Sequence, residues 1–102
     1  MAKIQAQNMA RFQKMAHVLT ESNLPTLADR ARYVDYPFGH IAENVAIGYP
    51  DAETVVEGWM ASKGHRANIL ERDVAETGIG IARSSAGGVY YCQVFGRQLR
   101  SL

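Results

Sequence analysis

The sequence predicts a small α+β domain, and three observations lead to this expectation. The chain has 102 residues, of which 47% are hydrophobic, and this is enough to build one core. Three segments carry helix signals, and two segments near the C-terminus carry strand signals on either side of a glycine-rich turn. We therefore expect residues 1–102 to form a single domain.

The first helix is expected from Ala2 to about His17. The alanines and methionines of this segment favour a helix, and Ala6, Met9 and Ala10 share one of its faces. His17 falls on the same face, so its side chain should point in the same direction as theirs.

A second, shorter helix is expected over residues 26–33. The Ser-Asn-Leu-Pro sequence at 22–25 separates it from the first helix. This helix should end before Pro37, because a proline disfavours helical geometry at the preceding Tyr36.

The third helix has clearer boundaries, at about 51–62. Asp51 is a good N-cap, Glu53 complements the helix dipole, and Lys63-Gly64 supplies a cation and a glycine for the C-terminus. One stripe of this helix is apolar and should face the core: Ala52, Val55, Val56 and Trp59.

Residues 78–83 and 89–95 are the strand candidates, and the connection 84–88 predicts a hairpin. Residues 44–48 are apolar and rich in β-branched side chains, so they form either a third strand or a buried extended segment. Cys92 lies within an apolar strand and should behave as a small buried hydrophobe of low reactivity.

Composition excludes several classes of protein. The 11 basic and 10 acidic residues give a formal charge of +1, so no field of the whole protein attracts nucleic acid or an anionic membrane. A single cysteine excludes an intramolecular disulfide and a zinc site of paired thiolates. The chain contains no apolar stretch of about 20 residues for a transmembrane segment, and its N-terminus lacks the apolar core of a signal peptide. We therefore expect a soluble chain.

Two sequence blocks carry a family resemblance. Ala42-Glu43-Asn44-Val45-Ala46-Ile47-Gly48, followed by residues 55–70 with the run Ser62-Lys63-Gly64-His65-Arg66-Ala67-Asn68-Ile69-Leu70, resembles the signature blocks of bacterial members of the CAP superfamily. This superfamily includes cysteine-rich secretory proteins and plant pathogenesis-related proteins. Asp29-Arg30, Tyr36 and the closing hairpin agree with the family pattern, and the likeness extends from about Ala6 to Gly96. The resemblance implies a three-layer α-β-α sandwich with a small central antiparallel sheet.

The resemblance also implies a cleft with two histidines and two acidic residues. His17 matches the first histidine, Glu43 the first acid and His65 the second histidine. The second acid would stand three residues after Trp59, where this chain has Ser62, so the set of four is incomplete.

Each of these residues also has a simpler structural interpretation. His17 would stabilise the C-terminal end of its helix, and His65 would satisfy carbonyl groups just after the third helix. Glu43 would accept hydrogen bonds from backbone amides of its own loop. His40 matches no family position and is expected on the surface.

Two functions follow for the cleft. The first is a non-enzymatic, extracellular or cell-envelope CAP domain that binds a divalent cation, a small ligand or a peptide. Zinc or another divalent cation would bind His17 and His65. Glu43 would be a third ligand or the hydrogen-bond partner of one imidazole. The second is a metal-assisted, peptidase-like hydrolase with Glu43 as general base. The hydrolase lacks a free base, because a carboxylate that orients a histidine cannot also take a proton from water and Ser62 cannot replace the second acid. A third interpretation is an inert interaction scaffold.

Family members usually carry one more helix before the helix that ends in the first histidine. The resemblance therefore implies an N-terminally short domain, with an uncovered apolar face that includes Ile4, Met9, Phe12 and Met15. We expect a second copy of the chain to cover this face in a homo-oligomer.

Overall fold

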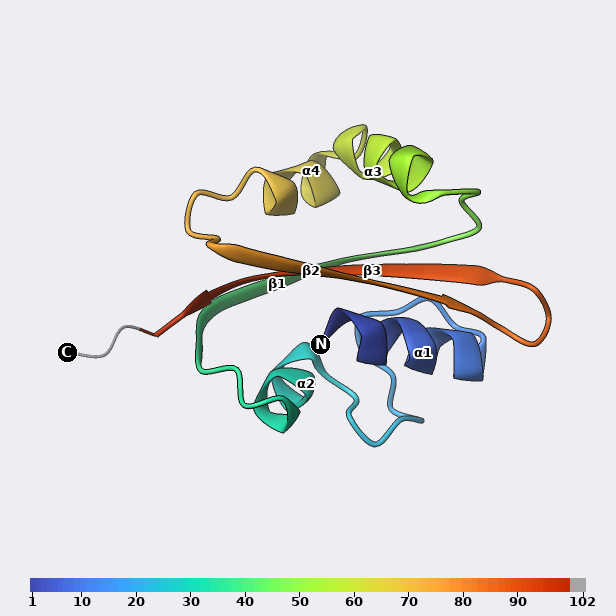
Figure 1. Cartoon of the computed structure of the whole chain (residues 1–102), viewed down its shortest axis with the longest axis horizontal. Coiled ribbons are helices and arrows are strands. Elements are labelled where there is room, and N and C mark those ends of the chain that lie inside the picture. The colour runs from blue at the N-terminus through green and yellow to red at the C-terminus, as the bar shows by residue number, and fades with distance from the viewer. Residues whose placement is uncertain (100–102) are drawn as a thin grey trace.

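The computed structural model describes residues 1–99, and it is a three-layer α-β-α sandwich. Its elements follow in the order α1 (Ala2–Phe12), α2 (Leu27–Tyr33), β1 (Phe38–Ile47), α3 (Ala52–Met60), α4 (Lys63–Ile69), β2 (Glu76–Arg83) and β3 (Val89–Gln98). Helices α1 and α2 lie on one face of the sheet, and α3 and α4 lie on the other (Figure 1). The α+β class and the α-β-α layering are both confirmed.

The sheet is antiparallel, with β3 in the centre of the order β1-β3-β2. The apolar residues 44–48 contribute to β1, a strand that begins already at Phe38 and pairs with β3 along its length. Strands β2 and β3 form the expected hairpin, in which Gly87 has a left-handed φ of 92° and the Ser84 N–H donates to the Gly88 carbonyl. The open question about this segment is therefore answered in favour of a strand over residues 44–47, and Gly48 follows it with a φ of 88°.

Helix α1 ends at Phe12, before the expected end at His17. Gln13 turns left-handed with φ 52°, and the N–H groups of Gln13 and Lys14 both donate to the Met9 carbonyl. The Gln5 side chain then donates to the Ala16 carbonyl at 2.7 Å and holds the returning chain against the helix. Local helix propensity does not report this long-range contact, so placing His17 at the helix end was wrong.

Helix α2 forms as expected and ends before Pro37. Thr26 and Asp29 make a reciprocal capping box, in which each side chain accepts a hydrogen bond from the backbone N–H of the other residue. This cap fixes the start of a helix whose Arg30 is completely buried.

Residues 51–69 form two helices where the sequence predicted one. Asp51 caps α3 as expected, but Lys63 and Gly64 begin α4, with Ser62 at its N-cap position. Ile69 packs against the core cluster that contains Trp59, and this packing outweighs the poor helix propensity of glycine. Only Val55 and Trp59 of the expected apolar stripe are buried, whereas Ala52 and Val56 are exposed.

A separate core cluster lies on each face of the sheet. The cluster under α1 contains Ala6, Met9 and Cys92, and the cluster under α3 contains Val55 and Trp59. Met9 was expected on an uncovered apolar face, but its side chain is fully buried. Met15, from the same expected face, is half exposed. Within residues 1–99 no helix has the length and apolar character needed to cross a membrane.

Candidate functional site

Glu43 is the centre of a buried polar cluster on the α1/α2 side of β1. Only 2% of its side chain is exposed. Its Oε1 lies 3.0 Å from His17 Nδ1, and its Oε2 accepts from Arg30 Nη2 at 2.8 Å and from the Cys92 thiol at 3.4 Å. The partners come from α2, from β3 and from the connection between α1 and α2. The expectation that Glu43 accepts from backbone amides of its own loop was wrong, because Glu43 lies within a strand.

Arg30 is the main residue of this cluster that sequence reasoning did not assign to the site. Its side chain is fully buried on α2, where Nη2 also reaches the His17 carbonyl at 3.4 Å and Nη1 reaches the Leu24 carbonyl at 3.3 Å. Arg30 thus ties the connection between α1 and α2 to β1. The signal was present in the sequence, because a carboxylate buried among apolar neighbours needs a cationic partner and Arg30 was noted as part of the family pattern.

His17 lies at the surface end of the cluster, with 56% of its side chain exposed. The hydrogen bond that the protonated imidazole donates to Glu43 raises the pKa of His17 above 6.5, although partial burial and the Arg30 charge oppose this change. Since Glu43 engages Nδ1, Nε2 is the nitrogen left for another partner.

Cys92 lies at the inner end of the cluster. Burial, followed by the negative charge of Glu43, raises the pKa of its thiol far above the usual range. The group therefore stays protonated and donates to Glu43, in agreement with the low reactivity expected for it.

His65 belongs to a second polar cluster, on the α3/α4 side of the sheet. It was expected just after the end of a helix, but it lies in the first turn of α4. Its Nδ1 lies 2.9 Å from Ser62 Oγ, and its carbonyl accepts from the Asn44 amide at 3.1 Å. Asn68 completes this cluster by donating to Asn44 Oδ1 at 2.9 Å and to the Glu43 carbonyl at 3.3 Å.

The two clusters meet at β1 because neighbouring residues of a strand point to opposite faces of a sheet. Glu43 anchors His17 on one face, and the next residue, Asn44, anchors the backbone of His65 on the other. The structure thus brings His17 to Glu43 and His65 to Ser62, and no side-chain hydrogen bond joins the first pair to the second.

A cleft of about 290 Å³ opens beside β1, next to His65. We call it the β1 cleft, and it is lined by Met15, Val45, Ala46, Ile47, Tyr49, Gly58, Trp59, Ser62 and His65. Met15 comes from the same connection as His17, which places that connection at the mouth of the cleft. Within residues 1–99 no group of three or more His, Cys, Asp or Glu side chains is placed to hold a metal ion. Among the residues that line the β1 cleft, the one imidazole is that of His65.

His40 lies on β1, and its expected surface position was only partly right. The residue is half-buried, and its Nε2 is buried without a hydrogen-bond partner in the described part of the chain.

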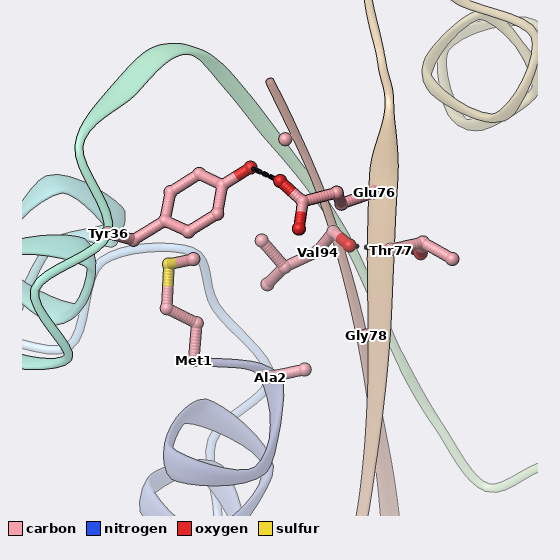
Figure 2. A pocket seen from close by; sticks show the side chains of 8 residues that line it. Met1, Ala2, Tyr36, Glu76, Thr77, Gly78 and Val94 are labelled. Carbon is pink, nitrogen blue, oxygen red and sulfur yellow. Dashed lines mark hydrogen bonds between the residues drawn. The ribbon is translucent and has the colours of Figure 1, made fainter. Parts of the chain in front are cut away.

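A smaller pocket of about 190 Å³ lies near the start of α1 (Figure 2). The Tyr36 hydroxyl points across it and donates to Glu76 Oε1 at 2.8 Å, while Val94 forms an apolar wall. Burial and Glu76 raise the pKa of Tyr36 to about 12, so the hydroxyl stays protonated. The ring also lies against Gly96, where a Cβ would come within 2.5 Å of the hydroxyl oxygen. We interpret this pocket as a structural junction between the α2–β1 connection and β2.

Comparisons with known proteins agree with this architecture. The sequence model of the family described as "CAP: Cysteine-rich secretory protein family" matches residues 1–95. Two relatives come from Bacillus subtilis (strain 168). The membrane protein YlbC is 37% identical over 70 residues, covering 69% of this chain and 19% of the relative, and YkwD is 40% identical over 55 residues, covering 54% and 21%.

Two solved structures share the fold. An extracellular protein containing a SCP domain from Bacillus anthracis str. Ames has a TM-score of 0.84 and 28% identity, over 95% of this chain and 30% of that protein. An outer surface protein from Borrelia burgdorferi has a TM-score of 0.83 over 96% of this chain and 71% of that protein, and at 21% identity this likeness concerns the fold alone. The chain spans about a fifth of the length of the curated relatives that it matches.

Proposed function

Because this chain belongs to the CAP family of cysteine-rich secretory proteins, we propose that it is a non-enzymatic, extracellular or cell-envelope binding domain. Its ligand is a small molecule or a peptide segment that enters the β1 cleft, beside a weakly held divalent cation such as zinc. The extracellular SCP protein that shares its fold supports this location.

The commitment of Glu43 is the observation that carries this proposal. A general base needs an accessible lone pair within reach of the water that it deprotonates. Both Glu43 oxygens already have hydrogen-bond partners, and the buried Arg30 holds one of them at 2.8 Å. Ser62 is likewise engaged by His65. Glu43 therefore acts as a positioning residue for His17, and this favours binding over metal-assisted hydrolysis.

The two histidines fit a weak cation site. Each imidazole is oriented through Nδ1 by an oxygen, from Glu43 for His17 and from Ser62 for His65, and this is the usual arrangement of histidines that bind a metal through Nε2. Structural zinc sites use four protein ligands, whereas this chain offers two imidazoles. The remaining positions would be open to water or to an oxygen of the bound ligand.

Zinc titration by calorimetry tests this site. We expect the wild-type chain to bind one zinc ion with a Kd in the micromolar range or weaker, and the His17→Ala and His65→Ala variants each to lose at least tenfold in affinity. His40→Ala is the matched control, because His40 lies outside both clusters, and it should bind as wild type does. Equal binding by all four proteins would remove zinc from the proposal.

A peptide-hydrolysis assay tests the absence of catalysis. The zinc-loaded chain should leave a mixed peptide library uncleaved, as followed by mass spectrometry. Cleavage that disappears in a folded Glu43→Gln variant would overturn the proposal in favour of the hydrolase.

A further inference from the structure

The net charge of +1 hides a strong separation of charge along the chain. All ten acidic residues lie between Glu21 and Glu76. Residues 1–20 and 77–102 contain basic residues only: Lys3, Arg11, Lys14, Arg83, Arg97 and Arg100. Parts of these two segments lie side by side, because α1 packs on β2 and β3. This packing brings Arg11 of α1 and Arg83 of β2 to one groove, whereas Lys14 pairs with Glu21 and Arg97 donates to the Asp73 carbonyl.

A groove of about 390 Å³ lies on this surface, between the second half of α1 and the β2–β3 turn. Arg11 and Gln7 line it from the helix, and Arg83, Ser84 and Ser85 line it from the hairpin. All five side chains can donate hydrogen bonds, and no carboxylate lines the groove. Its volume is within the range of small-ligand sites.

Both arginines lack an acidic partner among residues 1–99. Neither takes part in an ion pair, and Arg83 makes only a 3.4 Å hydrogen bond to the Gly87 carbonyl. Arg11 stacks at 5.2 Å over the Phe12 ring, which limits the positions of its guanidinium. Two guanidinium groups without a counter-ion create a strong preference for an anion.

Ser84 adds a fixed donor to the groove. The residue is buried, and its Oγ accepts from the Gly88 N–H at 3.0 Å. With its oxygen engaged as an acceptor, the hydroxyl hydrogen is available to a ligand. The tight turn of residues 84–88 holds this group in place, because the Gly87 N–H also donates to the Ser84 carbonyl.

We propose that this groove is a binding site for a phosphoryl group, with Arg11 and Arg83 as charge partners and Ser84 as hydrogen-bond donor. Guanidinium groups match the oxygens of a phosphate in a bidentate manner, and the hydroxyl reaches an oxygen that they leave free. The site is separate from the β1 cleft, because no residue lines both and β3 lies between β1 and β2 in the sheet. It therefore does not depend on the function proposed for the histidines.

Titration with inorganic phosphate at constant ionic strength tests this site, with the arginine Nε–H and backbone amide signals followed by NMR. The wild-type chain should show saturable shifts at Arg11, Arg83 and residues 84–88 with a millimolar Kd. The double variant Arg11→Gln/Arg83→Gln should bind at least tenfold more weakly. Arg11→Lys/Arg83→Lys keeps the charge but loses the planar fork, and it should fall between the two.

The control is Lys63→Gln/Arg72→Gln, which changes the net charge equally at exposed positions in the acidic part of the chain. This protein should bind phosphate within twofold of wild type. Equal weakening of both glutamine variants, or shifts that never saturate, would overturn the proposal by showing ion screening alone. Thermal melts of all the proteins establish that they are folded.

A second arm identifies the source of the phosphoryl group. Vesicles of phosphatidylglycerol and of phosphatidylcholine are sedimented with each protein. Binding to the anionic vesicles that requires both arginines supports a lipid headgroup, whereas phosphate binding without vesicle binding supports a soluble phosphate ester. Vesicle binding that is equal in the two glutamine variants, together with no saturable phosphate binding, would contradict the site.

Discussion

The two faces of the sheet are held to their helices by different chemistry. On the α1/α2 face, a buried ion pair between Glu43 and Arg30 joins the strand to the helix layer, and His17 extends it to the surface. On the α3/α4 face, neutral groups make the connection, because Asn44 bonds to Asn68 and to the His65 carbonyl, and the Trp59 indole donates to the Val45 carbonyl. The ionic face should therefore respond more strongly to loss of one partner, since an unpaired buried charge costs more than an unpaired amide.

Arg30→Met removes the buried ion pair of the α1/α2 face and should lower the free energy of unfolding more than any other substitution proposed. The variant leaves the Glu43 carboxylate buried without a cation, and loss of one partner of a buried ion pair costs about 3–5 kcal/mol. Urea denaturation measures the free energy of unfolding. Arg32→Met is the control from the same helix, because its ion pair with Asp29 is exposed and contributes about 0–1 kcal/mol.

A double variant separates charge from packing at the same position. Arg30→Met with Glu43→Leu removes both charges, so it should recover much of the stability that Arg30→Met loses. If the double variant is as unstable as the single one, the cost comes from lost packing and the comparison between the faces fails.

Asn44→Ala tests the hydrogen bonds of the α3/α4 face and should lower the free energy of unfolding less than Arg30→Met does. The change removes a partner from the Asn68 amide and from the His65 carbonyl, and buried groups left unpaired cost about 1–3 kcal/mol. Asn23→Ala, at an exposed position, should stay within about 0.5 kcal/mol of wild type in the same urea titration. A cost for Asn44→Ala above that of Arg30→Met would reverse the comparison.

The sequence predicted local features of both faces better than features that depend on long-range contacts. Caps and turns gave correct starts for α2 and α3 and a correct hairpin, because Thr26, Asp51 and the glycines at 87 and 88 act on their own neighbourhoods. The end of α1 was wrong and α4 was missed, because long-range contacts decide both: Gln5 holds Ala16, and Ile69 packs against the Trp59 cluster. Local signals thus predicted every helix except α4, but not where α1 ends.

The candidate site was predictable as residues but not as a network. Family motifs placed His17, Glu43 and His65, and the structure places the first two in contact. Arg30 and Asn44 escaped assignment because neither lies at one of the four family positions, and only the pairing of β1 with its neighbours shows that they hold the histidines in place. Alternation along β1 also explains why Glu43 and Asn44 serve opposite faces.

His17→Gln sharpens the comparison through pH. The pKa of His17 is raised in the folded state, so its stabilising contribution is fully present below about pH 6.5 and is lost as the pH rises through the folded pKa. Because more than half of the side chain is exposed, the effect should stay below about 1 kcal/mol. In urea titrations with a chelator, the free energy of unfolding of the wild type should exceed that of the variant by more at pH 5.5 than at pH 8.5.

Asn68→Ala provides the neutral control for this experiment. Its amide does not titrate, so the cost of the substitution should be the same at both pH values. A cost of His17→Gln that does not change with pH would show that its ion pair with Glu43 contributes nothing to stability.

The smallest effect is expected where the sheet is covered on one face only. Helix α1 packs on β2 from below, where a Cβ on Gly80 would come within 2.5 Å of the Ala2 carbonyl, whereas Ile79 and Ile81 alternate to the other face and are about half exposed. Threonine has a similar shape and a high strand propensity, so Ile79→Thr and Ile81→Thr should each cost less than about 1 kcal/mol. The two residues pair with different residues of β3, Ile79 with Gln93 and Ile81 with Tyr91, so their costs should roughly add in the double variant. Urea titrations measure these costs. A larger or non-additive cost, especially one that depends on protein concentration, would show that a second molecule covers Ile79 and Ile81 in solution. The part of the α3/α4 face that the helices leave exposed would then be an interface.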